Sequence, residues 1–360
     1  MSPELTKQKR LLSLDAYRGF TMFLMVSAGF GLSVLADNPG WEWLARQVDH
    51  VAWEGCVLWD LIQPSFIFIV GVAMPFAFAV RQQRGETRPH IFKHVWRRSL
   101  ILLLLGVGRV CIHRDELVFD MTTVLQQIAV AYFFAFFVLG RGIKTQFIAA
   151  FAILAADFLL FQFWPGVGPG GPWAKNANFH SAVELWVFGS LSPGGYTGMN
   201  AFGSIATVIF GVITGELLRR EVREMSKVWY LLLAGVAGIV IGYLLSPVIP
   251  VVKRIWTPSW TIYSAGWAAL LMAVFYWLIE IRGWRKWSFV FVVVGMNSIA
   301  IYMLVSLLRG SVISWIRVFT GWALGPLGDP GAIIHSTLVL AVFWYMVYWM
   351  YNRKIFLKVG

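Results

Sequence analysis

Residues 61–80 read LIQPSFIFIVGVAMPFAFAV, and no charged side chain interrupts them. A helix needs roughly 20 predominantly apolar residues to cross the hydrocarbon core of a bilayer, so this stretch predicts a transmembrane helix. Comparable runs fill the chain of 360 residues, of which 58% are hydrophobic and only 13% charged. That composition excludes an ordinary soluble enzyme, a disordered chain and a small disulfide-stapled fold. The sequence therefore predicts an all-α polytopic membrane protein with a single domain over residues 1–360.

The apolar runs predict about ten transmembrane helices. They cover residues 16–36, 56–80, 97–112, 121–140, 144–163, 200–218, 229–249, 259–281, 288–308 and 332–351. A further apolar stretch, Ser311 to Leu324, is short and contains Arg317 and Gly321. We expect it to be an interfacial or re-entrant segment, and an eleventh span is the alternative.

The net charge of +12 has two interpretations. In a soluble protein it would suggest nucleic acid as a partner. Here most Lys and Arg residues lie in alternate connections between the apolar runs, such as residues 81–98 and 219–227, which is the positive-inside pattern of membrane proteins. We therefore expect a lipid bilayer and no nucleic acid as partner, with both termini in the cytoplasm.

The longest connection, about residues 164–199, is rich in Gly, Pro and aromatic residues and should lie outside the cytoplasm. A connection of this length is usually a lid, a binding loop or disordered. Its aromatic side chains suit a sugar-binding surface, and the alternative is an aromatic belt at the membrane interface.

Ionisable residues near or inside predicted spans are functional candidates, because charged groups are costly in hydrocarbon. Asp60 lies just inside the outer end of the second span, and His50 precedes it by ten residues. If the chain folds back, the carboxylate fixes the imidazole tautomer and leaves the other ring nitrogen as a base. The alternative is a loop histidine beside an aspartate that caps its own helix.

Several other polar residues leave two interpretations open. Asp15 and Arg18 are three residues apart and form either an anchoring ion pair or part of an anion site. Asp157 and Arg109 either pair or line a pathway with Asp60, which would make the protein a transporter of small anions or sugars. The amides of Gln126 and Asn297 serve either helix packing or a site.

The small residues and the two cysteines bear on helix packing and on covalent cross-links. The G-x-x-x-G pairs Gly211/Gly215 and Gly238/Gly242 predict close helix packing, and with the apolar surface they leave a homodimer open. Cys56 and Cys111 both fall near outer helix ends, where a disulfide is conceivable in an oxidising compartment. Two cysteines exclude a Cys-rich metal site, and no metal site is expected.

Five blocks of the chain, in order, resemble a family of membrane acyltransferases, that of the heparan-α-glucosaminide N-acetyltransferases. They are Ser13-Leu14-Asp15-x-x-Arg18-Gly19; His50-x-x-Trp53-x-Gly55 followed by Asp60-Leu61 and the run Pro64 to Gly71; residues 124–129; residues 253–259; and Gly295-Met296-Asn297-Ser298. The chain departs from the family pattern at Gly29, Gln127 and Val252, where polar or basic residues are usual.

The resemblance implies that the chain takes an acetyl group from cytoplasmic acetyl-CoA and delivers it to an amino sugar or related glycan on the far side of the membrane. His50 corresponds to the catalytic base and Asp60 to its supporting carboxylate. For the oxyanion we expect Asn297 or Lys253. Guanidinium groups favour phosphate, so we expect an acetyl-CoA site near the cytoplasmic face. Its residues would be Arg18, Asp15, Gln126, Arg97, Arg98 and Arg282.

The short N-terminus and the lack of a large extramembrane domain suggest a bacterial inner-membrane protein. The identity of the acceptor, and the choice between direct transfer and an acetyl-histidine intermediate, stay open at this point.

Overall fold

The computed structural model describes residues 11–192 and 194–357, and within these ranges every regular element is a helix. The elements are α1 Leu12–Ser27, η1 Ala28–Asp37, α2 Glu42–Gln47, η2 Leu58–Leu61, α3 Ile62–Gln83, α4 Arg88–Arg114, α5 Val124–Ala135, α6 Ile143–Phe163, α7 Phe179–Phe188, α8 Asn200–Arg219, α9 Glu224–Leu245, α10 Pro258–Tyr276, η3 Trp277–Ile281, α11 Phe289–Met296, α12 Ser298–Leu324, η4 Gly325–Leu327 and α13 Asp329–Asn352.

Eight helical segments of the described residues are long and apolar enough to cross a membrane, fewer than the ten expected. The predicted spans 97–112 and 121–140 are the two that do not qualify. The first lies inside α4, whose 27 residues include several basic and histidine side chains, and the second contains α5, which has only 12 residues. The all-helical membrane class is confirmed, whereas the number of crossings stays a prediction.

Two predicted spans are broken in the structure. The run 16–36 ends as an α-helix at Ser27, because residues 28–31 have positive φ and turn the chain into the 3₁₀ segment η1. The run 288–308 is interrupted at Asn297, between α11 and α12. The expected separate segment Ser311 to Leu324 is wrong, because those residues form the second half of the continuous helix α12.

Glycines let several helices approach closely. A Cβ on Gly211 would lie 2.1 Å from the carbonyl oxygen of Phe68, and one on Gly215 would lie 2.3 Å from that of Val72. The predicted close packing of this motif is therefore confirmed, with α3 as the partner of α8. Gly238 and Gly242 meet α10 in the same way. Both motifs pack against other helices of the same chain, so neither is available for contact with a second copy.

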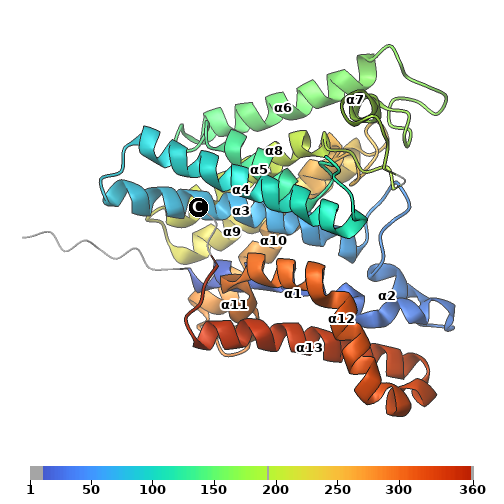
Figure 1. The fold of residues 1–360 in the computed structure, drawn as a ribbon. Coiled ribbons are helices and arrows are strands. Elements are labelled where there is room, and N and C mark those ends of the chain that lie inside the picture. Colours follow the sequence, from blue (N-terminus) through green and yellow to red (C-terminus); the bar gives the residue numbers. More distant parts are fainter. Residues whose placement is uncertain (1–10, 193, 358–360) are drawn as a thin grey trace, which may run out of the picture.

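The helices form two groups (Figure 1). Helices α1, α11, α12 and α13 lie on one side and pack in the pairs α1·α11 and α12·α13, while α3, α8, α5 and α6 pack on one another on the other side. Helix α1 joins the groups through contacts with α3 and α10. The start of α1 and the segment after α13 lie at one end of the molecule, and α2 and α7 lie at the opposite end. We call these the termini end and the α2/α7 end.

Candidate functional site

His50 and Asp60 come together at the α2/α7 end. The chain leaves α2, turns through residues 48–57 and enters η2, which carries Asp60. His50 Nδ1 lies 2.7 Å from Asp60 Oδ1, as the sequence spacing suggested. Oδ2 of Asp60 accepts from the main-chain N–H groups of Val57 at 3.3 Å and Val51 at 3.4 Å. Asp60 therefore holds both the start of its own helix and the imidazole.

Lys253 reaches the same carboxylate from a loop almost 200 residues away in the sequence. Its Nζ lies 3.3 Å from Asp60 Oδ1 and 3.2 Å from His50 Nδ1. Asp60 and Lys253 are buried, with 1% and 4% of their side chains exposed, whereas 37% of the His50 side chain is exposed. Burial lowers the pKa of Lys253 to about 8, and the charge of Asp60 opposes that shift. We call this group the His50 triad.

The exposed edge of His50 borders two clefts. One, of about 800 Å³, lies between η1, α2 and the 49–57 turn and carries the acidic residues Glu42, Asp49 and Glu54 along with Arg46. The other, of about 500 Å³, lies between the ends of α1, α4, α5 and α12 and carries Arg109, His113, Arg114 and Asp120. A histidine at the border of two clefts is placed to contact two different molecules.

The long connection packs against the triad's surroundings. Trp53 donates from Nε1 to the carbonyl of Trp173 at 3.1 Å, and Trp173 stacks on Phe161 of α6 with 4.6 Å between the ring centres. Arg254, next to Lys253, donates to the carbonyls of Gly194 and Val51. Ser192 and Tyr196 line the second cleft together with His50. The connection therefore contributes to the site, as a lid or binding loop would.

Gln126 lies at the α2/α7 end, at the first turn of α5. Its Oε1 accepts from the N–H of Thr123 at 2.9 Å and from the Thr123 hydroxyl at 2.6 Å, and its amide donates to the carbonyl of Asp120. Gln126 thus caps α5 and fixes the residues that line the second cleft. The neighbouring Gln127 links Gln63 of α3 to Ser204 of α8 through hydrogen bonds of 2.5 Å each.

Asn297 is not brought to the His50 triad. Its Nδ2 donates to the carbonyl of Ile355 at 3.0 Å, and its Oδ1 accepts from the N–H of Leu357 at 3.2 Å. It sits at the α11–α12 break, beside the segment that follows α13. The sequence motif that contains Asn297 therefore positions the end of the chain and not the imidazole.

Asp15 and Arg18 form the predicted i,i+3 ion pair, with 2.7 Å between Asp15 Oδ1 and Arg18 Nη2. Arg18 Nε also donates to the carbonyl of Gly295 at 2.8 Å. A Cβ on Gly295 would lie 2.1 Å from the carbonyl oxygen of Asp15, so α1 and α11 touch at this point. These contacts fix the Arg18 side chain at the interface between α1 and α11.

The other predicted acetyl-CoA residues are dispersed. Arg97 is exposed on the first half of α4, and the guanidinium carbon of Arg98 lies 4.7 Å from the ring centre of Tyr132. Arg98 also lines a cavity of about 60 Å³ with Arg81 and His94. Arg282 follows η3 and lies over Trp277 at 5.0 Å.

Asp157 has a partner that sequence reasoning missed. It does not pair with Arg109; its Oδ1 lies 2.9 Å from Nε2 of His180, and both side chains are fully buried. Arg109 instead donates to the hydroxyl of Ser306 at 2.6 Å. His180 is on α7, within the long connection, so no helix-face periodicity could have linked it to α6. Cys56 and Cys111 are both free thiols.

Comparisons with known proteins agree with the sequence motifs. A family model described as the catalytic region of heparan-alpha-glucosaminide N-acetyltransferase matches residues 10–241. The heparan-alpha-glucosaminide N-acetyltransferases of Homo sapiens and Mus musculus are each 23% identical to this chain over 97% of its length. The chain spans 60% of the length of each of these relatives.

Proposed function

Since the chain belongs to the heparan-alpha-glucosaminide N-acetyltransferase family, we propose that it is a membrane N-acetyltransferase. It moves an acetyl group from acetyl-CoA to an amino sugar or related glycan. One observation carries the proposal: His50, oriented by buried Asp60 and Lys253, stands at the border of two clefts. Two clefts that meet at one reactive group suit a transfer between two substrates. The proposed site extends beyond residue 241, where the family match ends, because it includes Lys253.

His50 acts as a general base. Its Nδ1 faces Asp60, so the proton sits on Nδ1 and the lone pair of Nε2 accepts a proton from the acceptor amine. The amine nitrogen then bonds to the thioester carbonyl carbon, the carbon–sulfur bond breaks, and the sulfur takes up the proton from Nε2. Asp60 stabilises the imidazolium formed in between. In the two-step route, Nε2 attacks the thioester carbonyl carbon and CoA leaves as the thiol. The amine then attacks the acetyl group on Nε2, and the imidazole leaves.

Lys253 balances the charge of Asp60 in the resting site. Its Nζ contacts both Asp60 and the imidazole, so it keeps the carboxylate ionised when His50 is neutral. Because Nζ lies beside the imidazole, we also propose it as a donor to an oxyanion on the thioester carbonyl. Asn297 has no part in the proposed reaction at His50, because the segment after α13 occupies its amide.

Acetyl-CoA enters along the seam of α1 and α12. The second cleft reaches from His50 to Met25 on α1 and Val305 on α12. Arg18 lies seven residues before Met25, which is about 10 Å along a helix. We assign the phosphates to Arg18 at the inner part of this seam. Arg97 and Arg98 on α4 and Arg282 after η3 are dispersed, so we propose for them a basic face of the molecule and not a single phosphate pocket. Asp15 orients Arg18, and Gln126 keeps the cleft in shape by capping α5.

The acceptor binds in the first cleft. Its three carboxylates attract the cationic ammonium group of an amino sugar. The ammonium loses one proton to water, and the neutral amine then gives its second proton to His50. By the positive-inside pattern this cleft faces away from the cytoplasm, and the acetyl-CoA mouth faces it. The proposed location is a bacterial inner membrane.

The proposal is tested with purified, detergent-solubilised protein, acetyl-CoA and glucosamine. We expect acetylglucosamine from the wild type and a loss of about 10²–10⁴-fold in kcat for His50→Ala, since that is the usual contribution of a general base. His335→Ala, a histidine of α13 that lines neither cleft, serves as the matched control. CoA binding should survive in both variants.

Undiminished turnover in His50→Ala would refute the assignment of the base. Mass spectrometry of wild-type protein with acetyl-CoA alone distinguishes the two chemical routes, because an acetylated His50 appears only in the two-step route. Folded protein that neither binds CoA nor releases it from acetyl-CoA would overturn the acetyltransferase proposal.

A further inference from the structure

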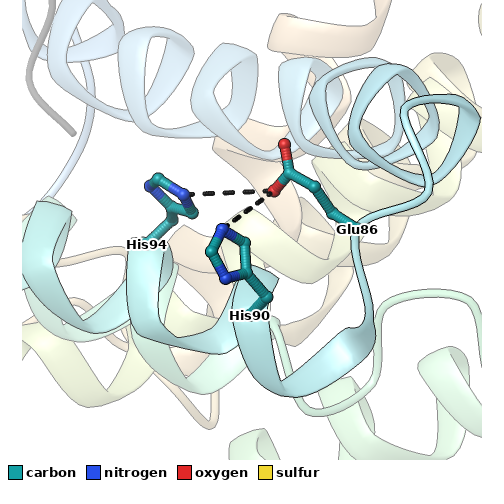
Figure 2. Close-up of side chains that lie close together, drawn as sticks. All are labelled: Glu86, His90 and His94. Atoms are coloured by element: carbon teal, nitrogen blue, oxygen red, sulfur yellow. Dashed lines mark ion pairs between the residues drawn. The ribbon is translucent and has the colours of Figure 1, made fainter.

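Three side chains with metal-binding atoms converge at the start of α4, away from the His50 triad (Figure 2). Glu86 lies in the connection between α3 and α4, and His90 and His94 lie four residues apart on the first turns of α4. Because residues i and i+4 share one face of a helix, both imidazoles point to the same side. The carboxylate of Glu86 reaches back over that side and faces both rings.

The distances between these atoms suit a shared ion better than direct bonds. Oε2 of Glu86 lies 3.9 Å from Nε2 of His90 and 4.0 Å from Nε2 of His94. Both separations are too long for a hydrogen bond. Ligands on a tetrahedral Zn²⁺, at roughly 2.0–2.1 Å from the metal, stand roughly 3.4 Å apart. The three ligand atoms all lie within 4.8 Å of one another, so small rotations bring them to that spacing.

The ligand atoms are open to solvent. The side chains of His90 and His94 are 57% and 32% exposed, and that of Glu86 is 19% exposed. The T-shaped contact of the two rings, at 5.1 Å between centres, keeps them side by side. An ion from solution therefore reaches the site without any opening of the bundle, and water can complete its coordination.

Arg81 competes for the same carboxylate. Its Nη1 lies 3.0 Å from Glu86 Oε2, the oxygen that faces both histidines. A bound dication attracts this oxygen more strongly than a guanidinium does, and it also repels the guanidinium. We therefore expect a metal ion at this oxygen to displace Arg81 from Glu86. Arg81 then stays with His94 and Arg98 around the small cavity at this end of α4.

We propose that Glu86, His90 and His94 form a site for one Zn²⁺ ion, which ties the α3–α4 connection to α4 in exchange for the Arg81–Glu86 ion pair. Two imidazole nitrogens and one carboxylate are ligands that zinc prefers, whereas Mg²⁺ and Ca²⁺ prefer oxygen ligands throughout. The two neutral imidazoles donate lone pairs, so binding involves no oxidation or reduction. The site is independent of acetyl transfer and of the function proposed above.

Untagged, chelator-treated full-length protein is titrated with Zn²⁺ in competition with a chromophoric zinc indicator. The wild type should bind one zinc ion per chain more tightly than the double variant His90→Ala/His94→Ala does. Loss of even a group that supports a metal ligand costs about 10–100-fold in affinity, so His90→Ala and His94→Ala should each lose at least about tenfold. Glu86→Gln should weaken binding in the same direction. His335→Ala should bind like the wild type.

Arg81→Gln gives the opposite expectation. Removal of the competing guanidinium should tighten zinc binding, because the carboxylate no longer has to leave a partner. A general loss of loop structure would weaken binding in every variant, so this increase distinguishes a metal site from a fold effect. Co²⁺ in place of Zn²⁺ should give a visible absorption band that His90→Ala and His94→Ala lose.

Equal zinc stoichiometry and affinity in the wild type and in the double variant His90→Ala/His94→Ala would overturn the site. Displacement of Zn²⁺ by equimolar Mg²⁺ would overturn the assignment of the ion. Unchanged or weaker binding in Arg81→Gln would overturn the exchange of Arg81 for the metal.

Discussion

Asp60 uses its two carboxylate oxygens for different purposes. Oδ2 accepts from the main-chain N–H groups of Val51 and Val57, and Oδ1 faces His50 and Lys253. A buried carboxylate is costly unless donors surround it, and here the donors come from its own turn, the preceding loop and a distant loop. The same residue therefore closes the 48–57 turn and sets the orientation of the imidazole.

Asp60→Asn should lower kcat by about 10²–10⁴-fold. The new amide oxygen stays with the N–H groups of Val51 and Val57, so the NH₂ group turns toward His50. Nδ1 of His50 must then accept a hydrogen bond from this NH₂ group, so the imidazole proton moves to Nε2. A protonated Nε2 cannot act as the base. Kinetic assays of the purified variant check this. Asp115→Asn, an exposed aspartate at φ 53°, is the control, and full activity in Asp60→Asn would contradict the assigned tautomer.

The pKa of Lys253, lowered to about 8 by burial, predicts an alkaline limit. Above pH 8 the folded protein loses this proton and Asp60 loses its cation, so activity should fall with a midpoint near pH 8. Lys253→Arg stays charged and should move the limb upward. The stability of the folded protein should change with pH in the opposite direction to the activity. Between pH 8 and the ordinary lysine pKa the unfolded chain binds more protons than the folded one, so stability rises with pH relative to Lys253→Arg.

Measurements of kcat and melting temperature from pH 7 to pH 10 check both directions. An alkaline limb that is identical in wild type and Lys253→Arg would exclude Lys253 as its source.

At the scale of elements, buried polar contacts that the sequence pattern does not predict fix the long connection in place. The buried His180–Asp157 pair joins α7 to α6, and Glu184 of α7 accepts from the N–H of Gly198 at 2.7 Å. Burial raises the pKa of the Glu184 carboxyl, and that main-chain donor opposes the shift. Trp173 stacks on Phe161 in the same region. These contacts explain why a Gly- and Pro-rich segment contributes ordered residues to the second cleft.

Glycine contacts decide how closely helices α3 and α8 approach. In Gly211→Ala the new methyl group would meet the Phe68 carbonyl oxygen, so the helices must separate, and overpacking of this kind costs roughly 1–3 kcal/mol. Gly108 of α4 has open space around it, so Gly108→Ala should stabilise by about 0.5–1 kcal/mol through helix propensity alone. Thermal unfolding in detergent distinguishes the two. Equal shifts in melting temperature would mean that helix contact at Gly211 is not limiting.

At the scale of the whole molecule, the proposed reaction requires that the α2/α7 end and the α3–α4 connection lie on opposite sides of the membrane. Exposed Lys175 lies in the long connection, and exposed Arg84 lies in the α3–α4 connection. In a background without Cys56 and Cys111, a membrane-impermeant maleimide on intact cells should label Lys175→Cys and not Arg84→Cys. Lysed cells should label both. Label on Arg84→Cys in intact cells would invert or reject the topology.

Composition and charge pattern determined the class of this protein, because a bilayer imposes its requirements on every span separately. Apolar runs predicted the membrane helices, and G-x-x-x-G pairs predicted close helix packing. The pairing of His50 with Asp60 could also be predicted, since the nine residues between them can form a short turn. Each of these inferences depends on residues that are close together in the sequence.

The tertiary structure alone decided which distant residues complete those local patterns. The family resemblance made Lys253 a candidate, but its contact with Asp60 depends on the packing of α10 against α3 and η2. Asp157 pairs with His180 and not with Arg109, one of the two alternatives left open, and Asn297 hydrogen-bonds the segment after α13 and not the His50 triad. The break at Asn297 and the positive φ values of residues 28–31 likewise interrupt runs that read as continuous helices. Hydropathy reports the solvent that each segment prefers, whereas a hydrogen-bond partner is chosen by packing across the whole chain.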